Sequence, residues 1–297
     1  AIMQYNVFTR AIYLRLSLDL ETAALLSMVL VALSVAILAL ANRIEQRGST
    51  YYAQRSARAH QRIALGRWQL AAQAFLALIA LLSLIAPLGV LSYWLINGLQ
   101  HGETLADVII PLQRSIRAAA LAALASGVLA LPFVLLQVRF PSRISQGLAR
   151  AAYLGYALPG VVIALAFVFA GARALGALRD WFGMTDYRSL GLLVAAYVVR
   201  FIPQALGPAR AGLLQVNPHL EESALTLGRN RTRVFASITL PLMRPGLVAG
   251  VAMVFLTAMK ELPVTLLLAP SGYTTLATRI WSASSESFYA RAAAPAL

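Results

Sequence analysis

Residues 222–241 read ESALTLGRNRTRVFASITLP and lie between two long apolar segments. Asn217 is suited to cap a helix that begins at Pro218, and Gly228 is suited to end it. A second short helix is expected over about 232–240, because the proline that follows has no N–H for a helix interior. The stretch therefore predicts a helix, a turn and a second helix.

Composition indicates that most of the chain spans a membrane. The sequence is 60% hydrophobic and 12% charged, with a mean hydropathy of +0.72, which is too apolar for an ordinary soluble domain. Several uncharged runs approach the roughly 20 residues that a helix needs to cross the hydrocarbon. We predict an all-α polytopic membrane protein with six full transmembrane helices and a truncated seventh. The predicted spans are 22–41, 70–97, 118–138, 151–172, 189–206 and 245–268, and the run 292–297 resembles a span cut short.

The net charge of +14 is distributed as in a membrane protein rather than a nucleic-acid-binding one. Fourteen arginines lie in the segments 42–69, 139–150 and 207–244. The segments assigned to the other side, 1–21, 98–112, 173–188 and 269–288, hold six. Because cytoplasmic loops are enriched in arginine and lysine, residues 217–241 are predicted to lie in the cytoplasm.

The spacing within residues 217–241 resembles the EAA loop of importer-type ABC permeases, and we use the name EAA loop for this segment. The family pattern has an acidic residue and two small ones, glycine six positions after the acidic residue, isoleucine ten later and proline three beyond. Ser223 stands where the family usually has alanine. The predicted ATPase-coupling residues are Glu222, Ser223, Ala224, Gly228, Arg229, Ile238, Leu240 and Pro241.

Residues 255–270 and 278–281 resemble the ferric-iron branch of these permeases. The resemblance implies a transport subunit of the bacterial inner membrane that has no catalytic residue and binds no metal or cofactor of its own. A periplasmic solute-binding protein would deliver the solute, and a dimer of ATP-binding-cassette ATPases would use ATP and magnesium. Permeases for thiamine, polyamines, phosphonates or sulfate share much of this plan.

Lys260 is the only lysine, and Glu261 follows it. A Walker-type phosphate loop needs Gly-Lys before serine or threonine, so ATP hydrolysis is expected in a separate chain. Within the apolar span, Lys260 and Glu261, with a bend at Pro263, predict either a polar lining or gate of the path or charges paired with a neighbouring span. Arg200 allows the same two interpretations. An ion-coupled secondary transporter is the alternative from another class, and there the pair would be the coupling charges.

Other features predict domain organisation and packing. A short internal similarity between residues 5–24 and 273–293 suggests two fused halves. Residues 1–41 are then expected to end a first half, 42–69 to form a basic cytoplasmic connector, and 70–297 to form a second half whose last helix is truncated. Gly246 and Gly250 have the spacing of close helix packing. His101, Glu103 and Asp107 form a polar outer loop, which is either ordinary solvated surface or a contact for a binding protein or a cation.

Overall fold

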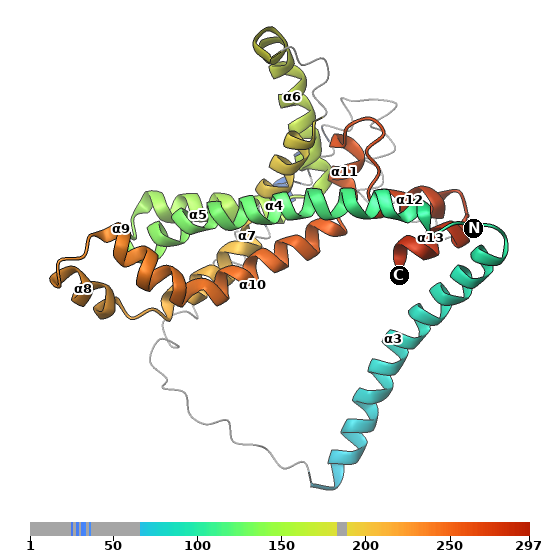
Figure 1. Ribbon diagram of the computed structural model, residues 1–297, viewed down its shortest axis with the longest axis horizontal. Coiled ribbons are helices and arrows are strands. Elements are labelled where there is room, and N and C mark those ends of the chain that lie inside the picture. Colours follow the sequence, from blue (N-terminus) through green and yellow to red (C-terminus); the bar gives the residue numbers. More distant parts are fainter. Residues whose placement is uncertain (1–24, 26–27, 30, 34–35, 37–65, 183–188) are drawn as a thin grey trace.

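The computed structural model describes residues 25, 28–29, 31–33, 36, 66–182 and 189–297 (Figure 1). The predicted span 22–41 and the predicted connector 42–69 lie mostly outside the described residues. The rest is helical, with no strand among the described residues. The helices are α3 (Gln69–Gln100), α4 (Ala106–Arg139), α5 (Arg143–Ala157), α6 (Gly160–Phe182), α7 (Leu190–Leu214), α8 (Pro218–Thr226), α9 (Arg231–Val234), α10 (Leu240–Met259), α11 (Pro263–Leu268), α12 (Leu276–Ser285) and α13 (Tyr289–Ala296).

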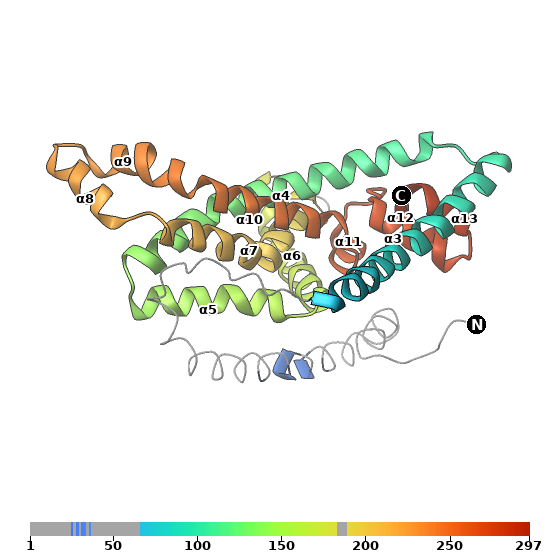
Figure 2. The same ribbon diagram turned by 90° about the horizontal axis from the view of Figure 1, so that it is seen from below.

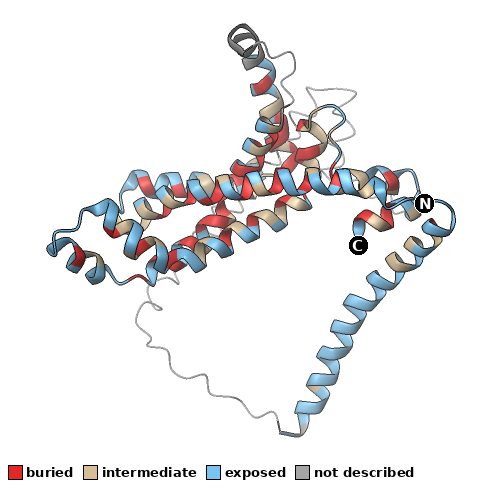
Figure 3. Cartoon of the chain, in the orientation of Figure 1, coloured by how far each residue is buried: buried red, intermediate tan, exposed pale blue. Residues whose placement is uncertain are grey.

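The centre of the structure is a bundle of α4, α7 and α10, with α5 alongside (Figures 1 and 2). At one end of the bundle α8 and α9 project outward, and at the opposite end α12 and α13 lie near the turn between α3 and α4. The α3 helix diverges from the bundle and is exposed along nearly its whole length, with only Gly98 buried (Figure 3). An apolar helix that is exposed on all sides is expected to face lipid or another membrane helix.

Four helices within the described part of the chain are long and apolar enough to cross a membrane. They are α3, α4, α7 and the continuous helical segment Arg231–Met259. The predicted spans 70–97, 118–138 and 189–206 are confirmed by the first three: α3 and α4 extend beyond both predicted ends, whereas α7 begins one residue after the predicted start and extends beyond the predicted end.

The predicted span 151–172 is not one straight helix, because the chain bends by 108° between α5 and α6, which together are apolar enough to form a broken span or a re-entrant loop. Leu158 is extended, with φ −74° and ψ 139°, and Pro159 follows it. A residue before proline avoids the helical conformation, and proline has no N–H for the preceding turn, so the helix stops there. Ser142 and Ser145 form a capping box at the start of α5, which sets its other end.

The prediction of a helix that ends near Pro241 is wrong, and the predicted span 245–268 is confirmed only over 245–259, within a longer helical segment. The chain is helical from Arg231 to Met259 and passes through Pro241 without a break. A π-helical turn, Phe235–Thr239, precedes this proline. Such a turn shifts the hydrogen-bond ladder, and this accommodates a residue that has no N–H. At the far end, Lys260 leaves the helical conformation and the short helix α11 begins at Pro263.

Glycines allow α7 and α10 to approach closely. A Cβ atom on Gly250 would lie 2.8 Å from the carbonyl oxygen of Ala205, and one on Gly246 would collide with the carbonyl of Pro208. Gly212 of α7 faces the same contact. The prediction of close packing at Gly246 and Gly250 is therefore confirmed.

Candidate functional site

The EAA loop folds as the helix, turn and helix start that its sequence predicts. Asn217 caps α8, since its Oδ1 accepts a hydrogen bond from the His219 N–H at 3.0 Å, and Pro218 occupies the first turn. Gly228 has φ +82°, a left-handed conformation that glycine adopts without steric cost. Asn230 then caps α9 through the Arg233 N–H.

Most side chains of the EAA loop are exposed. Ala224 is the buried residue of α8, and Val234 is the buried residue of α9. Exposed groups include Leu220, Leu225, Leu227, Arg229, Arg231 and Arg233. Since α8 and α9 project from the bundle (Figure 1), this end presents apolar and positively charged side chains together. Such a mixed surface is typical of a protein docking site.

The predicted coupling residues divide into exposed and packed ones. Glu222 is 68% exposed and contacts only His219, at 3.0 Å, on the same helix. Ser223 and Arg229 are exposed, and the Arg229 guanidinium donates to the Ser237 hydroxyl. Ile238 and Leu240 are half-buried, whereas Pro241 is exposed.

Sequence reasoning did not include Glu221 among the coupling residues. Its carboxylate forms more contacts with other segments than the carboxylate of Glu222 does. Oε2 of Glu221 lies 3.1 Å from Nε of Arg139, at the end of α4, and Oε1 accepts from Arg139 Nη2 at 3.2 Å and from the Thr239 hydroxyl at 2.7 Å. Arg139 Nη2 also donates to the carbonyl of Val216 at 3.0 Å. The available signal was an arginine in the last turn of an apolar helix and a glutamate in the first turn of another, both favoured by the helix dipoles.

The second predicted group, Lys260, Glu261 and Pro263, lies at the break between α10 and α11. Glu261 is 8% exposed, and its Oε2 lies 3.5 Å from Nε of Arg200 on α7. Its Oε1 accepts from the Val264 N–H at 3.2 Å, at the start of α11. Lys260 is exposed and forms no ion pair with any described residue. For Glu261 and Arg200, the geometry therefore favours the interpretation as charges paired between segments.

Arg200 joins this break to the other one. Its Nη1 donates to the carbonyl of Leu158 at 3.1 Å, at the bend between α5 and α6. Gly160 lies against the pair, because a Cβ there would be 2.8 Å from Glu261 Oε1 and 2.9 Å from Arg200 Nη1. Arg200, on the unbroken helix α7, thus contacts both the bend between α5 and α6 and the break between α10 and α11. Their exposed backbone groups find partners inside the protein, as a membrane interior requires.

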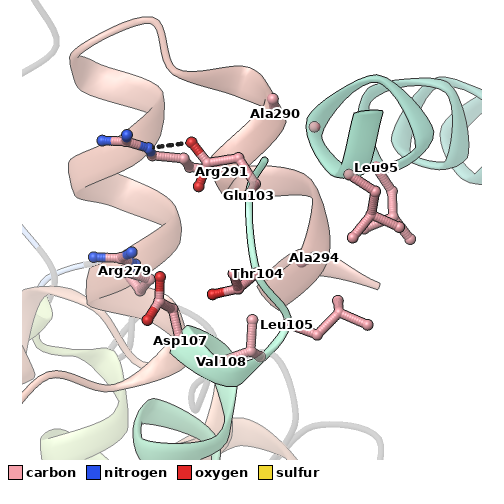
Figure 4. A pocket seen from close by; sticks show the side chains of 12 residues that line it. Leu95, Glu103, Thr104, Leu105, Asp107, Val108, Arg279, Ala290, Arg291 and Ala294 are labelled. Atoms are coloured by element: carbon pink, nitrogen blue, oxygen red, sulfur yellow. Dashed lines mark hydrogen bonds and ion pairs between the residues drawn. The ribbon is translucent and has the colours of Figure 1, made fainter. Parts of the chain in front are cut away.

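The predicted outer loop is tied to the C-terminal helices. Glu103 accepts a hydrogen bond of 2.6 Å from Nε of Arg291 on α13, and this bond raises the pKa of the Arg291 guanidinium (Figure 4). Asp107 and Arg279 line the same hollow, whose volume of about 20 Å³ is enough for one water. Within the described residues, no group of three or more His, Cys, Asp or Glu residues is placed to hold a metal ion.

Sequence and structure together define a polytopic helical membrane protein with an exposed helical loop at one end of its bundle. Residues 123–297 match the family model described as binding-protein-dependent transport system inner membrane component. The chain therefore belongs to this family, as its resemblance to importer-type permeases predicts.

Known proteins similar to the chain include transport permeases. It is 33% identical over 306 residues to the Fe(3+)-transport system permease protein FbpB 2 of Haemophilus influenzae, a match that covers 100% of this chain and 58% of the relative. It is 38% identical over 118 residues to the molybdenum transport system permease protein ModB of Escherichia coli, covering 38% of this chain and 51% of ModB. The chain thus spans little more than half the length of these relatives.

A solved structure shares the fold. It is the crystal structure of a bacterial ABC transporter involved in the import of the acidic polysaccharide alginate, with a TM-score of 0.59 and 17% identity. The match covers 77% of this chain and 88% of the matched chain. The likeness confirms the predicted importer-type permease fold.

Proposed function

We propose that this chain forms part of the membrane pathway of an ATP-driven importer whose solute is ferric iron. The assignment of the solute rests on the 33% identity to an iron-transport permease, because that match covers the whole chain. The match to a molybdenum permease covers 38% of the chain, and the match to the sulfate permease CysT of Escherichia coli covers 66% at 30% identity. Molybdate and sulfate are therefore the rival solutes to test.

The proposed partners are two ATPase subunits on the cytoplasmic side and a periplasmic binding protein on the other. The exposed EAA loop supports the ATPase subunits as partners. The excess of arginine in the segments on the same side as this loop supports its placement on the cytoplasmic face of the bacterial inner membrane. ATP and magnesium would be bound by the ATPase subunits. In this proposal Glu222 and Arg229 contact the ATPase, Ser223 allows its close approach, and the buried Ala224 packs α8 against the rest of the chain. Gly228 makes the turn, and Ile238, Leu240 and Pro241 seat the helix that follows.

Transport in this proposal is a movement of helices and involves no covalent chemistry by this chain. Closure of the ATPase dimer would displace α8, and the bundle would pass from one packed arrangement to another. Lys260, with its exposed side chain, is the residue we propose to test as a polar lining of the path. Pro263 starts α11 and keeps the break between α10 and α11 open.

Uptake by the full-length permease tests the proposal. The permease, its ATPase subunits and its binding protein are reconstituted in proteoliposomes, and entry of radioactive iron(III), molybdate and sulfate is compared with and without ATP. We expect ATP-dependent entry of iron(III) alone, and a loss of about tenfold or more in Glu222→Ala. Entry of molybdate or sulfate instead would contradict the assigned solute. Uptake that follows an ion gradient without ATPase subunits would contradict the importer class in favour of a secondary transporter.

A further inference from the structure

We infer that the ion pair between Arg139 and Glu221 transmits movement of α8 to the membrane bundle. The inference rests on the proposed role of the EAA loop and adds a residue that lies outside its motif. We call these two side chains the Arg139–Glu221 clamp. Neither residue belongs to the set of coupling residues that the motif predicts.

The clamp connects three segments at one carboxylate. Nη2 of Arg139 donates to one oxygen of Glu221 at 3.2 Å, and Nε lies 3.1 Å from the other as an ion-pair contact without hydrogen-bond geometry, so the guanidinium makes a two-point contact with the carboxylate. The Thr239 hydroxyl adds a third contact from the π-helical turn before α10. The end of α4, the start of α8 and the start of α10 therefore meet at Glu221.

Apart from its covalent links to α7 and α9, α8 has few attachments to the bundle. Ala224 is the only residue of α8 that is buried, and its methyl group offers a small apolar contact. Both side chains of the clamp are shielded, with 18% of Arg139 and 19% of Glu221 exposed, so the pair is less screened than a surface salt bridge. The orientation of α8 relative to α4 is therefore set mainly by polar contacts.

Glu222 has no such connection. Its partner His219 is 82% exposed and lies three residues earlier in the same helix, so the contact joins α8 only to itself. The two adjacent glutamates thus have different positions: Glu222 is available to a partner protein, whereas Glu221 faces the bundle. A displacement of α8 by a partner would pull on α4 and α10 through Glu221, because its carboxylate is bonded to both.

A structural test needs neither ATPase nor solute. This chain has no cysteine, so spin labels are placed at Ile144→Cys in α5 and Leu227→Cys after α8, both strongly exposed positions. We expect Arg139→Gln and Glu221→Gln each to widen the distribution of distances between the labels about twofold, since the polar contacts orient α8. Arg150→Gln, a matched exposed arginine in α5, is expected to leave the distribution unchanged.

Three further variants separate the clamp from a simple effect on folding. Arg139→Lys keeps the charge and loses the two-point contact, so it is expected to widen the distribution as well. Thr239→Val removes one hydroxyl contact and is expected to have a smaller effect in the same direction. The exchanged pair Arg139→Glu with Glu221→Arg is expected to narrow the distribution relative to either single exchange. Unchanged distributions in Arg139→Gln and Glu221→Gln would overturn the clamp.

A transport measurement tests the role of the clamp in coupling. In the reconstituted importer, Arg139→Gln and Glu221→Gln are expected to retain ATPase subunits and ATP hydrolysis, while iron(III) entry per ATP falls about tenfold. Glu222→Ala is expected to lose ATPase binding instead. Unchanged entry per ATP in both clamp variants would overturn the coupling role. If the unaltered importer showed no ATP-driven uptake, the proposed function would fail, whereas the label distances would still decide whether the clamp orients α8.

Discussion

Removing one charge from the buried Arg200–Glu261 pair is expected to lower the free energy of unfolding by about 3–5 kcal/mol. Arg200→Met leaves the carboxylate of Glu261, a residue only 8% exposed, without its counter-charge. Glu261→Leu likewise leaves the guanidinium of Arg200 without its counter-charge. The cost arises from desolvation, because an unpaired charge that is shielded from water recovers little of its lost hydration.

The double variant gives the sharper expectation. If the two effects were independent, Arg200→Met with Glu261→Leu would cost about 6–10 kcal/mol. The double variant contains no unpaired charge, however, and it loses the bonds to the Leu158 carbonyl and the Val264 N–H. At roughly 1 kcal/mol for each hydrogen bond, the expected cost is about 2 kcal/mol. The double variant is therefore expected to be more stable than either single variant.

Unfolding by SDS titration of the purified permease in mixed micelles measures these free energies. Lys260→Met is the matched control, because this neighbouring charge is exposed and is expected to change stability by less than about 0.5 kcal/mol. A double variant whose loss equals the sum of the single losses would refute the pairing of these charges.

Three further expectations test the packing and the helix ends. Gly246→Val is expected to destabilise the fold by about 1–3 kcal/mol or more, because its side chain meets a backbone carbonyl of α7, whereas Gly207→Ala enters open space and is expected to be neutral; SDS titration compares them. Ser142→Ala removes a capping box and is expected to cost about 1 kcal/mol, seen as faster amide hydrogen exchange in the first turn of α5. Glu103→Gln breaks an exposed pair with Arg291 and is expected to cost no more than about 1 kcal/mol in the same titration; a larger loss would show that this pair holds α13 in place.

Local chemistry was sufficient to predict the EAA loop. The cap at Asn217, the first-turn proline Pro218 and the turn at Gly228 depend on groups within a few residues of each other, so the sequence pattern contains them. The end of the second helix was mispredicted. A proline usually ends a helix, but the π-helical turn before Pro241 lets the helix continue.

The breaks within the predicted spans were also not predicted by hydropathy. Hydropathy averages over about 20 residues, so it located 151–172 and 245–268 as apolar but did not detect the bend after Leu158 or the helix end at Met259. Both breaks leave backbone groups that need partners. Arg200 supplies one of these directly, at Leu158, and Glu261 supplies another, at Val264.

By itself, the sequence determined that this protein is helical and spans a membrane, and it determined the local form of the EAA loop, because length, hydropathy and capping depend on residues that are near one another in the chain. Only the tertiary structure decided the partners of its charges. Arg139 and Glu221 are 82 residues apart, and Arg200 and Glu261 are also far apart in sequence. An arginine finds its carboxylate through helix packing, and the helix dipole, which favours a glutamate in the first turn, does not say which side chain that glutamate will contact.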